Sequence, residues 1–207
     1  MNNKREIWKT FIAVEGIDGS GTTTLSRLLC GKLNDKNLQC EKGFEPTDGP
    51  VGRLIRESLS GNPSFQRETL AYLFAADRHE HLYSQGGILS CIKNGGIYIS
   101  DRYFFSSLAY QSLDAGWDRV NTINIRFPLP SHLIFLDLPA VKAMERINGR
   151  ENRDVFENTP FQEKVALSYR KTIEQYKNKG IKILELDSNE PAEYLAEKAF
   201  EFIIDSI

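Results

Sequence analysis

Residues 11–24 read Phe-Ile-Ala-Val-Glu-Gly-Ile-Asp-Gly-Ser-Gly-Thr-Thr-Thr, and this stretch decides the fold. Residues 11–14 form a short apolar run, which is typical of a strand buried on both faces. Gly16, Gly19 and Gly21 follow, and a helical pattern then continues to about residue 34. A buried strand that turns through glycines directly into a helix predicts the start of a parallel βαβ unit.

Further strands and helices alternate along the rest of the chain. Short strands are predicted at about residues 39–44, 96–100, 133–137 and 181–186. Helices are predicted at about residues 50–60, 65–85, from 104, from 139, 160–177 and 191–204. This alternation predicts an α/β fold in one domain over residues 1–207, with a five-stranded parallel sheet flanked by helices and right-handed crossovers. Polar clusters follow Val14, Phe44 and Ser100, and because ligands of such sheets bind at the carboxyl ends of strands, these clusters should converge on one cleft.

The amino-acid composition disfavours several classes of function. The 207 residues carry a net charge of −2, so no broad basic surface favours nucleic acid or an anionic membrane. Three cysteines, Cys30, Cys40 and Cys91, form no C-x-x-C pair, which disfavours a disulfide framework or zinc site and fits a reducing cytoplasm. We expect no signal peptide and no membrane span, since no apolar run approaches the roughly 20 residues required.

The glycine-rich turn has the context of a phosphate loop, G-x-x-x-x-G-K-[ST], because it follows a strand and opens a helix. Its glycines let successive backbone N–H groups surround a phosphate, and the helix N-terminus adds partial positive charge. Thr23 stands where a hydroxyl binds Mg²⁺, but Thr22 replaces the lysine. The alternative interpretation is an ordinary glycine-rich turn. The predicted ATP-binding residues are Gly16, Ile17, Asp18, Gly19, Ser20, Gly21, Thr22, Thr23 and Thr24.

Two later strings have the residue types of an acceptor site. Phe74 and Arg78 lie four apart on the predicted helix 65–85, so they share a face that a base could meet. The alternative is a core phenylalanine beside a surface arginine. Asp101 and Arg102 end a strand near the phosphate loop, where a carboxylate holds Mg²⁺ or its waters and an arginine binds phosphate; here the alternative is a surface ion pair. His79 and His81 are predicted to be surface residues.

Taken together, these strings resemble the thymidylate kinase family over roughly residues 10–190. The resemblance is carried by the order and spacing of residues 15–21, Glu45-Pro46, residues 74–78 and residues 101–111. The last string, Asp-Arg-Tyr-Phe-Phe-Ser-Ser-Leu-Ala-Tyr-Gln, is the most specific. The resemblance implies the fold of P-loop nucleoside monophosphate kinases, with ATP and Mg²⁺, dTMP as acceptor, and a homodimer.

The resemblance also implies roles for individual residues. Phe74 would stack on thymine, Arg78 would bond its carbonyl, and Arg102 would hold the acceptor phosphate. Asp101 and Thr23 would support Mg²⁺, and Asp18 would reach the sugar 3′-hydroxyl or the metal. The remaining implied substrate-binding residues are Glu45, Ser107, Tyr110 and Gln111, of which Tyr110 would lie beneath the deoxyribose and disfavour a 2′-hydroxyl.

Three departures from the family remove a cation near the phosphates. They are Thr22 in the loop, Phe44 where many bacterial members carry arginine before Glu-Pro, and Val155. Residues 154–157 read Asp-Val-Phe-Glu, where Asp-Arg-Phe-Glu is common in the family. Residues 148–158 are polar and charged and are predicted to form a short mobile lid. Because Gly19 stands where eukaryotic-type enzymes place an arginine, the chain resembles the bacterial type, with Arg150 and Arg153 of the lid as the catalytic cations. Two rival hypotheses stay open: a kinase for another pyrimidine deoxynucleoside monophosphate, and a nucleotide-binding module that has lost catalysis.

Overall fold

A five-stranded parallel sheet forms the centre of the computed structural model, which describes residues 5–147 and 159–205. Its order is β2-β3-β1-β4-β5. The strands are β1 Ile7–Gly16, β2 Cys40–Phe44, β3 Ile97–Asp101, β4 Leu129–Asp137 and β5 Lys182–Asp187. The described helices are α1 Thr22–Asp35, α2 Pro50–Leu59, α3 Arg67–Tyr83, α4 Ile88–Lys93, α5 Phe104–Tyr110, α6 Ser112–Ala115, α7 Trp117–Asn124, α8 Ala140–Ile147, α9 Thr159–Tyr176 and α10 Ala192–Ile204. The predicted α/β fold and its five parallel strands are confirmed.

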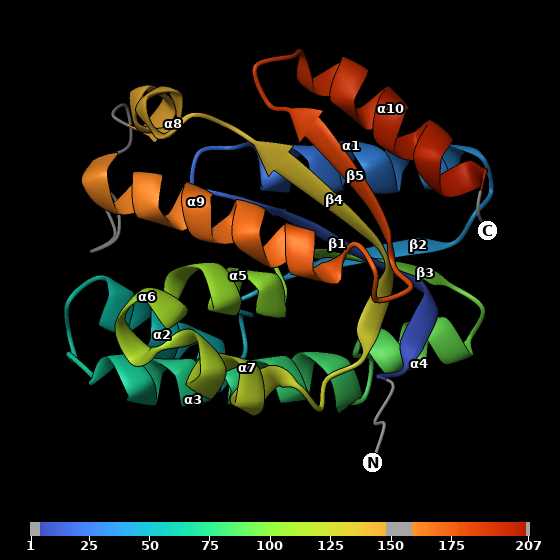
Figure 1. Ribbon diagram of the computed structural model, residues 1–207. Helices are drawn as coiled ribbons and strands as arrows, with labels where there is room; N and C mark the ends of the chain where they lie inside the picture. Colours follow the sequence, from blue (N-terminus) through green and yellow to red (C-terminus); the bar gives the residue numbers. More distant parts are fainter. Residues whose placement is uncertain (1–4, 148–158, 206–207) are drawn as a thin grey trace.

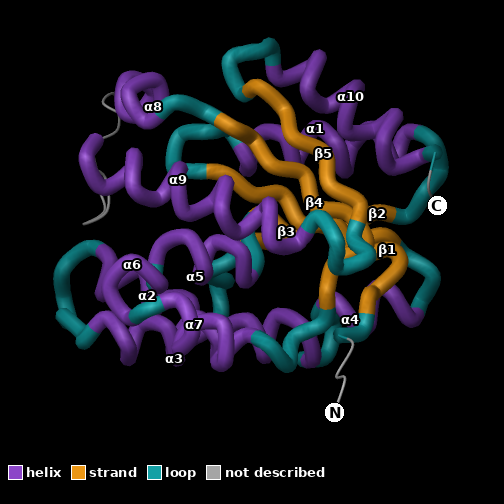
Figure 2. The backbone as a smooth tube through the Cα atoms, viewed as in Figure 1, coloured by secondary structure: helices purple, strands orange, loops and turns teal. Residues whose placement is uncertain are grey.

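Helices cover both faces of this sheet, as Figures 1 and 2 show. On one face α1 and α10 pack against β1, β3 and β4 through an apolar cluster that includes Leu29, Ile99 and Ala199. The other face carries α5 and α9, with α3 and α7 beyond them (Figure 1). Its larger cluster is rich in aromatic side chains, among them Phe104 and Tyr169. The sheet is therefore the middle layer, and its strand ends are left to carry the site.

The strand register brings the carboxyl ends of β1, β2 and β3 to one edge. Val14 of β1 and Phe44 of β2 both pair with Asp101, the last residue of β3. In the sheet, β2 and β3 lie on one side of β1, and β4 and β5 lie on the other side. The strand order thus reverses at β1, and ligands of open α/β sheets bind in the crevice outside the strand ends at such a point.

The sequence explains the two elements next to this crevice. Residues 11–14 of β1 are almost completely buried, as expected for a central parallel strand. Leu25, Leu29 and Leu33 of α1 are spaced by four and buried, which gives the helix one apolar face. Gly21 has φ 91° just before α1, a conformation that a side chain disfavours.

Three regions differ from the sequence-based predictions or lie outside the described part. The helix predicted from residue 104 is divided into α5, α6 and α7, with Gly116 at φ 85° between the last two. The short helix α4 was not predicted. The predicted lid, residues 148–158, lies outside the described residues. Within the described ranges, no helix has both the length and the apolar character needed to cross a membrane.

Candidate active site

The glycine-rich turn after β1 leaves backbone amides open at the start of α1. Gly19 and Gly21 have positive φ, and a Cβ on Gly16 would lie 2.4 Å from Ser20 Oγ and 2.8 Å from the Leu136 carbonyl oxygen. Leu25 N–H donates the bond that closes the first helical turn, to the Gly21 carbonyl (2.9 Å). The three threonine amides before Leu25 therefore have no acceptor within the helix, which is the arrangement that binds an anion.

A carboxylate and a hydroxyl meet beside this turn. Thr23 Oγ1 donates a hydrogen bond of 2.5 Å to Asp101 Oδ2. Asp101 is buried, and its other oxygen, Oδ1, has no hydrogen-bond partner among the described residues. Because hard cations prefer carboxylate and hydroxyl oxygens, this orphaned oxygen beside the phosphate loop would suit a Mg²⁺ ion.

Arg102 connects the phosphate loop to α9. Its backbone has φ 75° and its N–H donates to the Val14 carbonyl (2.9 Å). Its guanidinium donates from Nη2 to Asp18 Oδ1 (3.0 Å) and from Nη1 to the Tyr169 hydroxyl (2.9 Å). Asp18 is held further by Gln162 Nε2, which donates to Oδ2 (3.0 Å), and by its own N–H, which donates to the Tyr110 hydroxyl (3.0 Å). Hydrogen bonds from α5 and α9 thus fix Asp18 in the loop and Arg102 beside it.

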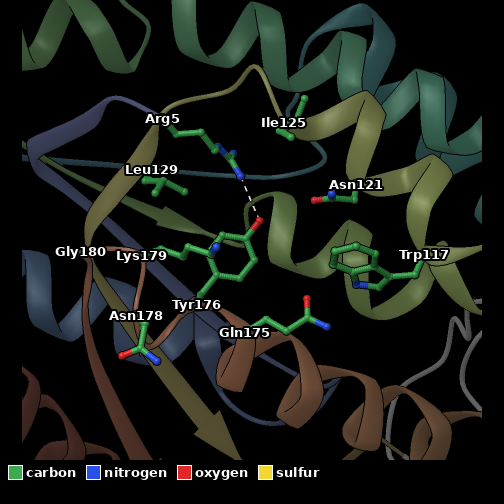
Figure 3. Close-up of a pocket in the computed structure, with 10 residues that line it drawn as sticks. All are labelled: Arg5, Trp117, Asn121, Ile125, Leu129, Gln175, Tyr176, Asn178, Lys179 and Gly180. Atoms are coloured by element: carbon green, nitrogen blue, oxygen red, sulfur yellow. Dashed lines mark hydrogen bonds between the residues drawn. The ribbon is translucent and has the colours of Figure 1, made fainter. Parts of the chain in front are cut away.

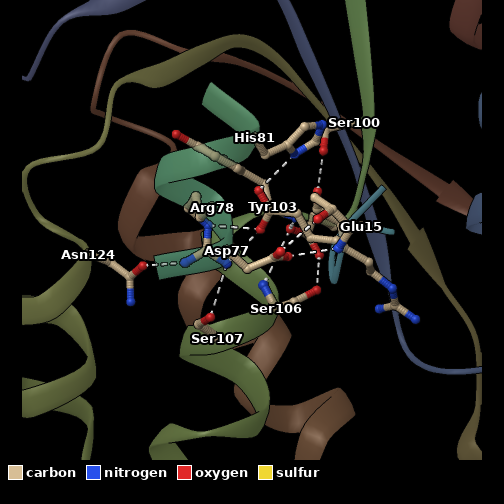
Figure 4. Close-up of polar contacts among 12 residues, drawn as sticks. Glu15, Asp77, Arg78, His81, Ser100, Tyr103, Ser106, Ser107 and Asn124 are labelled. Atoms are coloured by element: carbon tan, nitrogen blue, oxygen red, sulfur yellow. Dashed lines mark hydrogen bonds and ion pairs between the residues drawn. The ribbon is translucent and has the colours of Figure 1, made fainter. Parts of the chain in front are cut away.

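The fully buried carboxylate of Glu15 supports this arginine through Tyr169 (Figure 4 shows Glu15 among the polar contacts). Glu15 Oε1 accepts from Tyr103 N–H (2.8 Å) and Ser106 N–H (3.3 Å), and Oε2 accepts from the Ser106 hydroxyl (2.7 Å) and the Tyr169 hydroxyl (2.8 Å). Burial raises the pKa of Glu15 to about 7, and the charge of Arg102 opposes that shift. Burial also raises the pKa of Tyr169, so its hydroxyl stays protonated and can donate to Glu15.

Arg78 is the centre of a second buried network. It donates to Glu45 (Nε to Oε2, 2.9 Å), to Asn124 Oδ1 (2.5 Å) and to the Ser107 hydroxyl (3.2 Å), and the ion pair with Glu45 closes to 2.7 Å at Nη2. Figure 4 shows Asn124 and Ser107 reaching Arg78 from separate helices. The same Glu45 contacts His81 Nδ1 (3.2 Å), whose Nε2 lies 2.9 Å from the Tyr98 hydroxyl. The prediction that His81 is a surface residue is wrong, because the buried Glu45 and Tyr98 supply polar partners for its ring.

The other predicted acceptor residues lie on α3, on α5 and directly after α5. Phe74 is half-buried and packs against the aromatic cluster, and Tyr110 and Ser107 are buried on α5. Gln111 is buried, and its Oε1 has no hydrogen-bond partner among the described residues. Arg150 and Arg153, the predicted lid cations, lie outside the described residues.

Several candidate residues were not predicted from the sequence. Arg146, at the end of α8, donates to the carbonyls of Ser188 (2.8 Å) and Gly19 (3.4 Å). It lines a cavity of about 310 Å³ beside the phosphate loop, together with Thr24 and Glu190. Gln162 and Asn124 were missed as well, and Glu15 was quoted in the string of residues 15–21 without a role of its own. Spacing gives no signal for these roles, since the partners lie 42 to 154 positions away along the chain.

The site combines a phosphate loop at the reversal point of a five-stranded parallel sheet with a carboxylate suited to Mg²⁺ and an arginine. This combination defines the class of protein. The fold is that of the P-loop nucleoside monophosphate kinases.

Comparison with known proteins specifies the family. The family model described as thymidylate kinase matches residues 14–198. A thymidylate kinase homologue from Treponema pallidum (strain Nichols) is 37% identical over 93% of both chains. Homologues from Aeropyrum pernix (38% identity, 85% of this chain and 84% of the other) and Thermococcus onnurineus (40%, 80% and 85%) also align. The chain belongs to the thymidylate kinase family, and as a member it is a phosphotransferase.

Proposed function

We propose that the chain transfers the γ-phosphate of ATP to dTMP, with Mg²⁺, and releases ADP and dTDP. The observation that carries this proposal is the contact between Asp18 of the phosphate loop and Arg102 (3.0 Å), because a guanidinium beside this loop suits an acceptor phosphate that must lie next to a donor phosphate. Family membership supplies the identity of the acceptor.

On the donor side, the open threonine amides of α1 would hold the phosphates of ATP. The cavity of about 310 Å³ beside Gly19 and Arg146 is the natural position for the rest of the donor. Thr23 and Asp101 would hold Mg²⁺, which supplies charge neutralisation of the β- and γ-phosphates when bound. We assign Gly16, Ile17, Asp18, Gly19, Ser20, Gly21, Thr22, Thr23 and Thr24 to ATP binding.

On the acceptor side, the phosphate of dTMP would replace the Asp18 carboxylate on Arg102. The released Asp18 would face the sugar 3′-hydroxyl or the metal. Phe74 would stack on the base, and the orphaned Gln111 Oε1 supports a base- or sugar-facing role for that amide. Glu45, Arg78, Ser107 and Tyr110 complete the proposed acceptor site.

The reaction needs no covalent enzyme intermediate. An oxygen of the dTMP phosphate forms a bond to the γ-phosphorus as the bond from that phosphorus to the β,γ-bridging oxygen breaks, and the electron pair leaves with ADP. The protein contributes alignment of the two phosphates and fixed positive charge around the transferring group. Arg102 has this role here, and we propose that Arg150 and Arg153 add to it from the lid in the manner of bacterial-type members.

A coupled assay of ADP release with dTMP, dUMP, dCMP, UMP and dGMP tests this function. We expect dTMP to be the best acceptor and the ribonucleotides to be poor ones. Faster turnover of UMP or dGMP would contradict the acceptor assignment. Because the phosphate-loop lysine is missing, the assay also tests the rival hypothesis of a nucleotide-binding module without catalysis. A chain that binds ATP but is inactive with all five acceptors would be such a module.

We also propose that the chain acts as a single kinase domain, assembles as a homodimer and works in the cytoplasm. The family resemblance supports the dimer, and sedimentation of the purified protein measures it directly.

A further inference from the structure

A separate cavity lies at the end of the sheet opposite the phosphate loop. It has a volume of about 710 Å³ and opens between α7, the end of α9 and the turn that precedes β5. Leu129, which begins β4, forms part of its wall, so the cavity is at the amino ends of the strands. The volume is within the range of roughly 300–1,000 Å³ that is common for small-molecule sites.

Arg5 places a fixed cation in the wall of this cavity (Figure 3). Its guanidinium donates to the Phe127 carbonyl (2.7 and 2.9 Å), the Asn124 carbonyl (3.2 Å) and the Tyr176 hydroxyl (2.9 Å), and it lies 4.3 Å from the centre of the Phe104 ring. All these oxygens are uncharged, so they fix the orientation of the guanidinium without neutralising its charge. Burial lowers the pKa of Arg5, and Tyr176 opposes the shift, as expected for a desolvated cation.

The rest of the lining supplies the other parts of an organic anion site. Lys179 is a second cation at the cavity, and none of the described residues that line it is acidic, although the chain as a whole has a net charge of −2. The indole of Trp117 offers a flat apolar surface. Figure 3 shows the amide of Asn121 above Trp117 in the view and the amide of Gln175 below it. Amides at this position can donate to and accept from the polar edge of a planar ring.

We propose that this cavity is a second binding site for a nucleotide. The base would stack on Trp117, its polar edge would be met by Asn121 and Gln175, and the phosphate would lie toward Arg5 and Lys179. The volume argues against a simple inorganic anion, which would leave most of the cavity empty. The proposal does not rest on the proposed function, because the residues involved are distinct from those assigned to ATP and dTMP.

The test measures nucleotide binding at the cavity itself, through a side chain that lines it. In a Trp8→Phe background, Trp117 is the remaining tryptophan, and its fluorescence reports on the cavity. The protein is titrated separately with UDP, uridine and inorganic phosphate, with no other nucleotide present, because ADP or dTMP would compete for a nucleotide site. We expect UDP to quench Trp117 saturably, with uridine and phosphate binding at least about tenfold more weakly, since each keeps only part of the contacts.

Variants then locate the site. The double variant Asn121→Ala, Lys179→Ala should weaken UDP binding about tenfold, because it removes a polar contact and a charged one. The matched control Lys171→Ala removes an exposed lysine of α9 that does not line the cavity, and it should leave UDP binding unchanged. Arg102→Ala should also leave it unchanged, since Arg102 belongs to the other site.

Four outcomes would overturn the proposal. They are an absence of saturable quenching at millimolar UDP, binding that the double variant does not weaken, and binding of inorganic phosphate as tight as that of UDP, which would indicate a simple anion site. The fourth is a Trp117 signal that depends on protein concentration alone, which would assign the cavity to a second copy of the chain.

Discussion

Arg102 combines an unfavourable backbone conformation with tightly specified contacts. A non-glycine residue at φ 75° lies in the left-handed region, at a cost of about 1–3 kcal/mol. The Val14 carbonyl accepts its N–H (2.9 Å), and the Ser100 hydroxyl donates to its carbonyl (2.5 Å). These bonds hold the backbone so that the guanidinium reaches both Asp18 and Tyr169. Strain of this kind at a strand end fits a residue that is positioned for a ligand.

We predict that Arg102→Ala strongly reduces phosphoryl transfer and weakens dTMP binding by about 1.5–3 kcal/mol, the contribution typical of a hydrogen bond to a charged group. Calorimetric titration with dTMP measures the affinity. Arg170→Ala is the matched control, because Arg170 forms an exposed ion pair with Asp137 (2.9 Å). If the Arg102 variant bound dTMP as tightly as the control, Arg102 would be only an ion-pair partner of Asp18.

Glu15 gives a prediction for the pH dependence of stability. Its pKa is raised from 4.5 to about 7 in the folded chain, so the folded state holds the proton more tightly than the unfolded state. The resulting stabilisation is fully present below about pH 4.5 and is lost as the pH rises through about 7. At 1.36 kcal/mol per pKa unit, the loss amounts to at most about 3 kcal/mol.

We predict that Glu15→Gln removes this part of the pH dependence. The glutamine carbonyl can accept from the Tyr103 and Ser106 amides, and its NH₂ group can donate to a hydroxyl of Ser106 or Tyr169 that reverses its role. Urea unfolding at pH 5, 6, 7 and 8 measures the effect, with the exposed Glu163→Gln as control. Parallel curves for the wild type and the Glu15 variant would show that another group is responsible.

At the scale of elements, the sequence was most informative where local pattern and tertiary position agree. The central strands were found because strands buried on both faces are continuously apolar, and α1 because leucines recur on one face. The region after Phe104 was predicted less well. Gly116 was not recognised as a break between helices, and α4 has only six residues, too few for a periodic signal.

The phosphate loop gives a prediction about missing charge. Thr22 occupies the first position of α1 and is buried, so the proposed ATP site has no lysine at this position. Thr22→Lys should raise turnover or leave it unchanged. Among Arg146→Ala, Arg150→Ala and Arg153→Ala, at least one should lose about 10²-fold in turnover, as expected when one electrostatic donor is removed. The loss should exceed any change in ATP binding.

Turnover at saturating ATP, Mg²⁺ and dTMP decides this point, with Lys142→Ala as an exposed control on α8. Normal wild-type activity together with three unimpaired arginine variants would contradict the compensation by arginine. An inactive wild type that becomes active with Thr22→Lys would instead show that the loop lysine has no substitute in this chain.

At the scale of the whole molecule, the site depends on contacts between distant segments, and this limited prediction from sequence. Asp18, Arg102 and Asp101 were predicted because each lies at a strand end, where topology alone brings residues together. Tyr169 on α9 contacts Arg102 across 67 positions, and only the packing of α9 on α5 produces that contact. Arg146 ends a surface helix, and a basic residue there is most simply interpreted as solvated.

The buried network of Arg78 joins four parts of the molecule. Through Glu45, Ser107 and Asn124 it connects α3 to the end of β2, to α5 and to α7. Arg78→Met would leave the Glu45 carboxylate buried without its cation, so we predict a loss of about 3–5 kcal/mol in the free energy of unfolding. In Arg78→Met, Glu45→Gln both charges of this ion pair are removed, and the double variant should be more stable than Arg78→Met alone. Urea unfolding of the wild type, both single variants and the double variant measures the coupling, and dTMP titration of the folded variants separates stability from base recognition. An Arg78→Met protein with unchanged stability but weaker dTMP binding would show that Arg78 acts on the base alone.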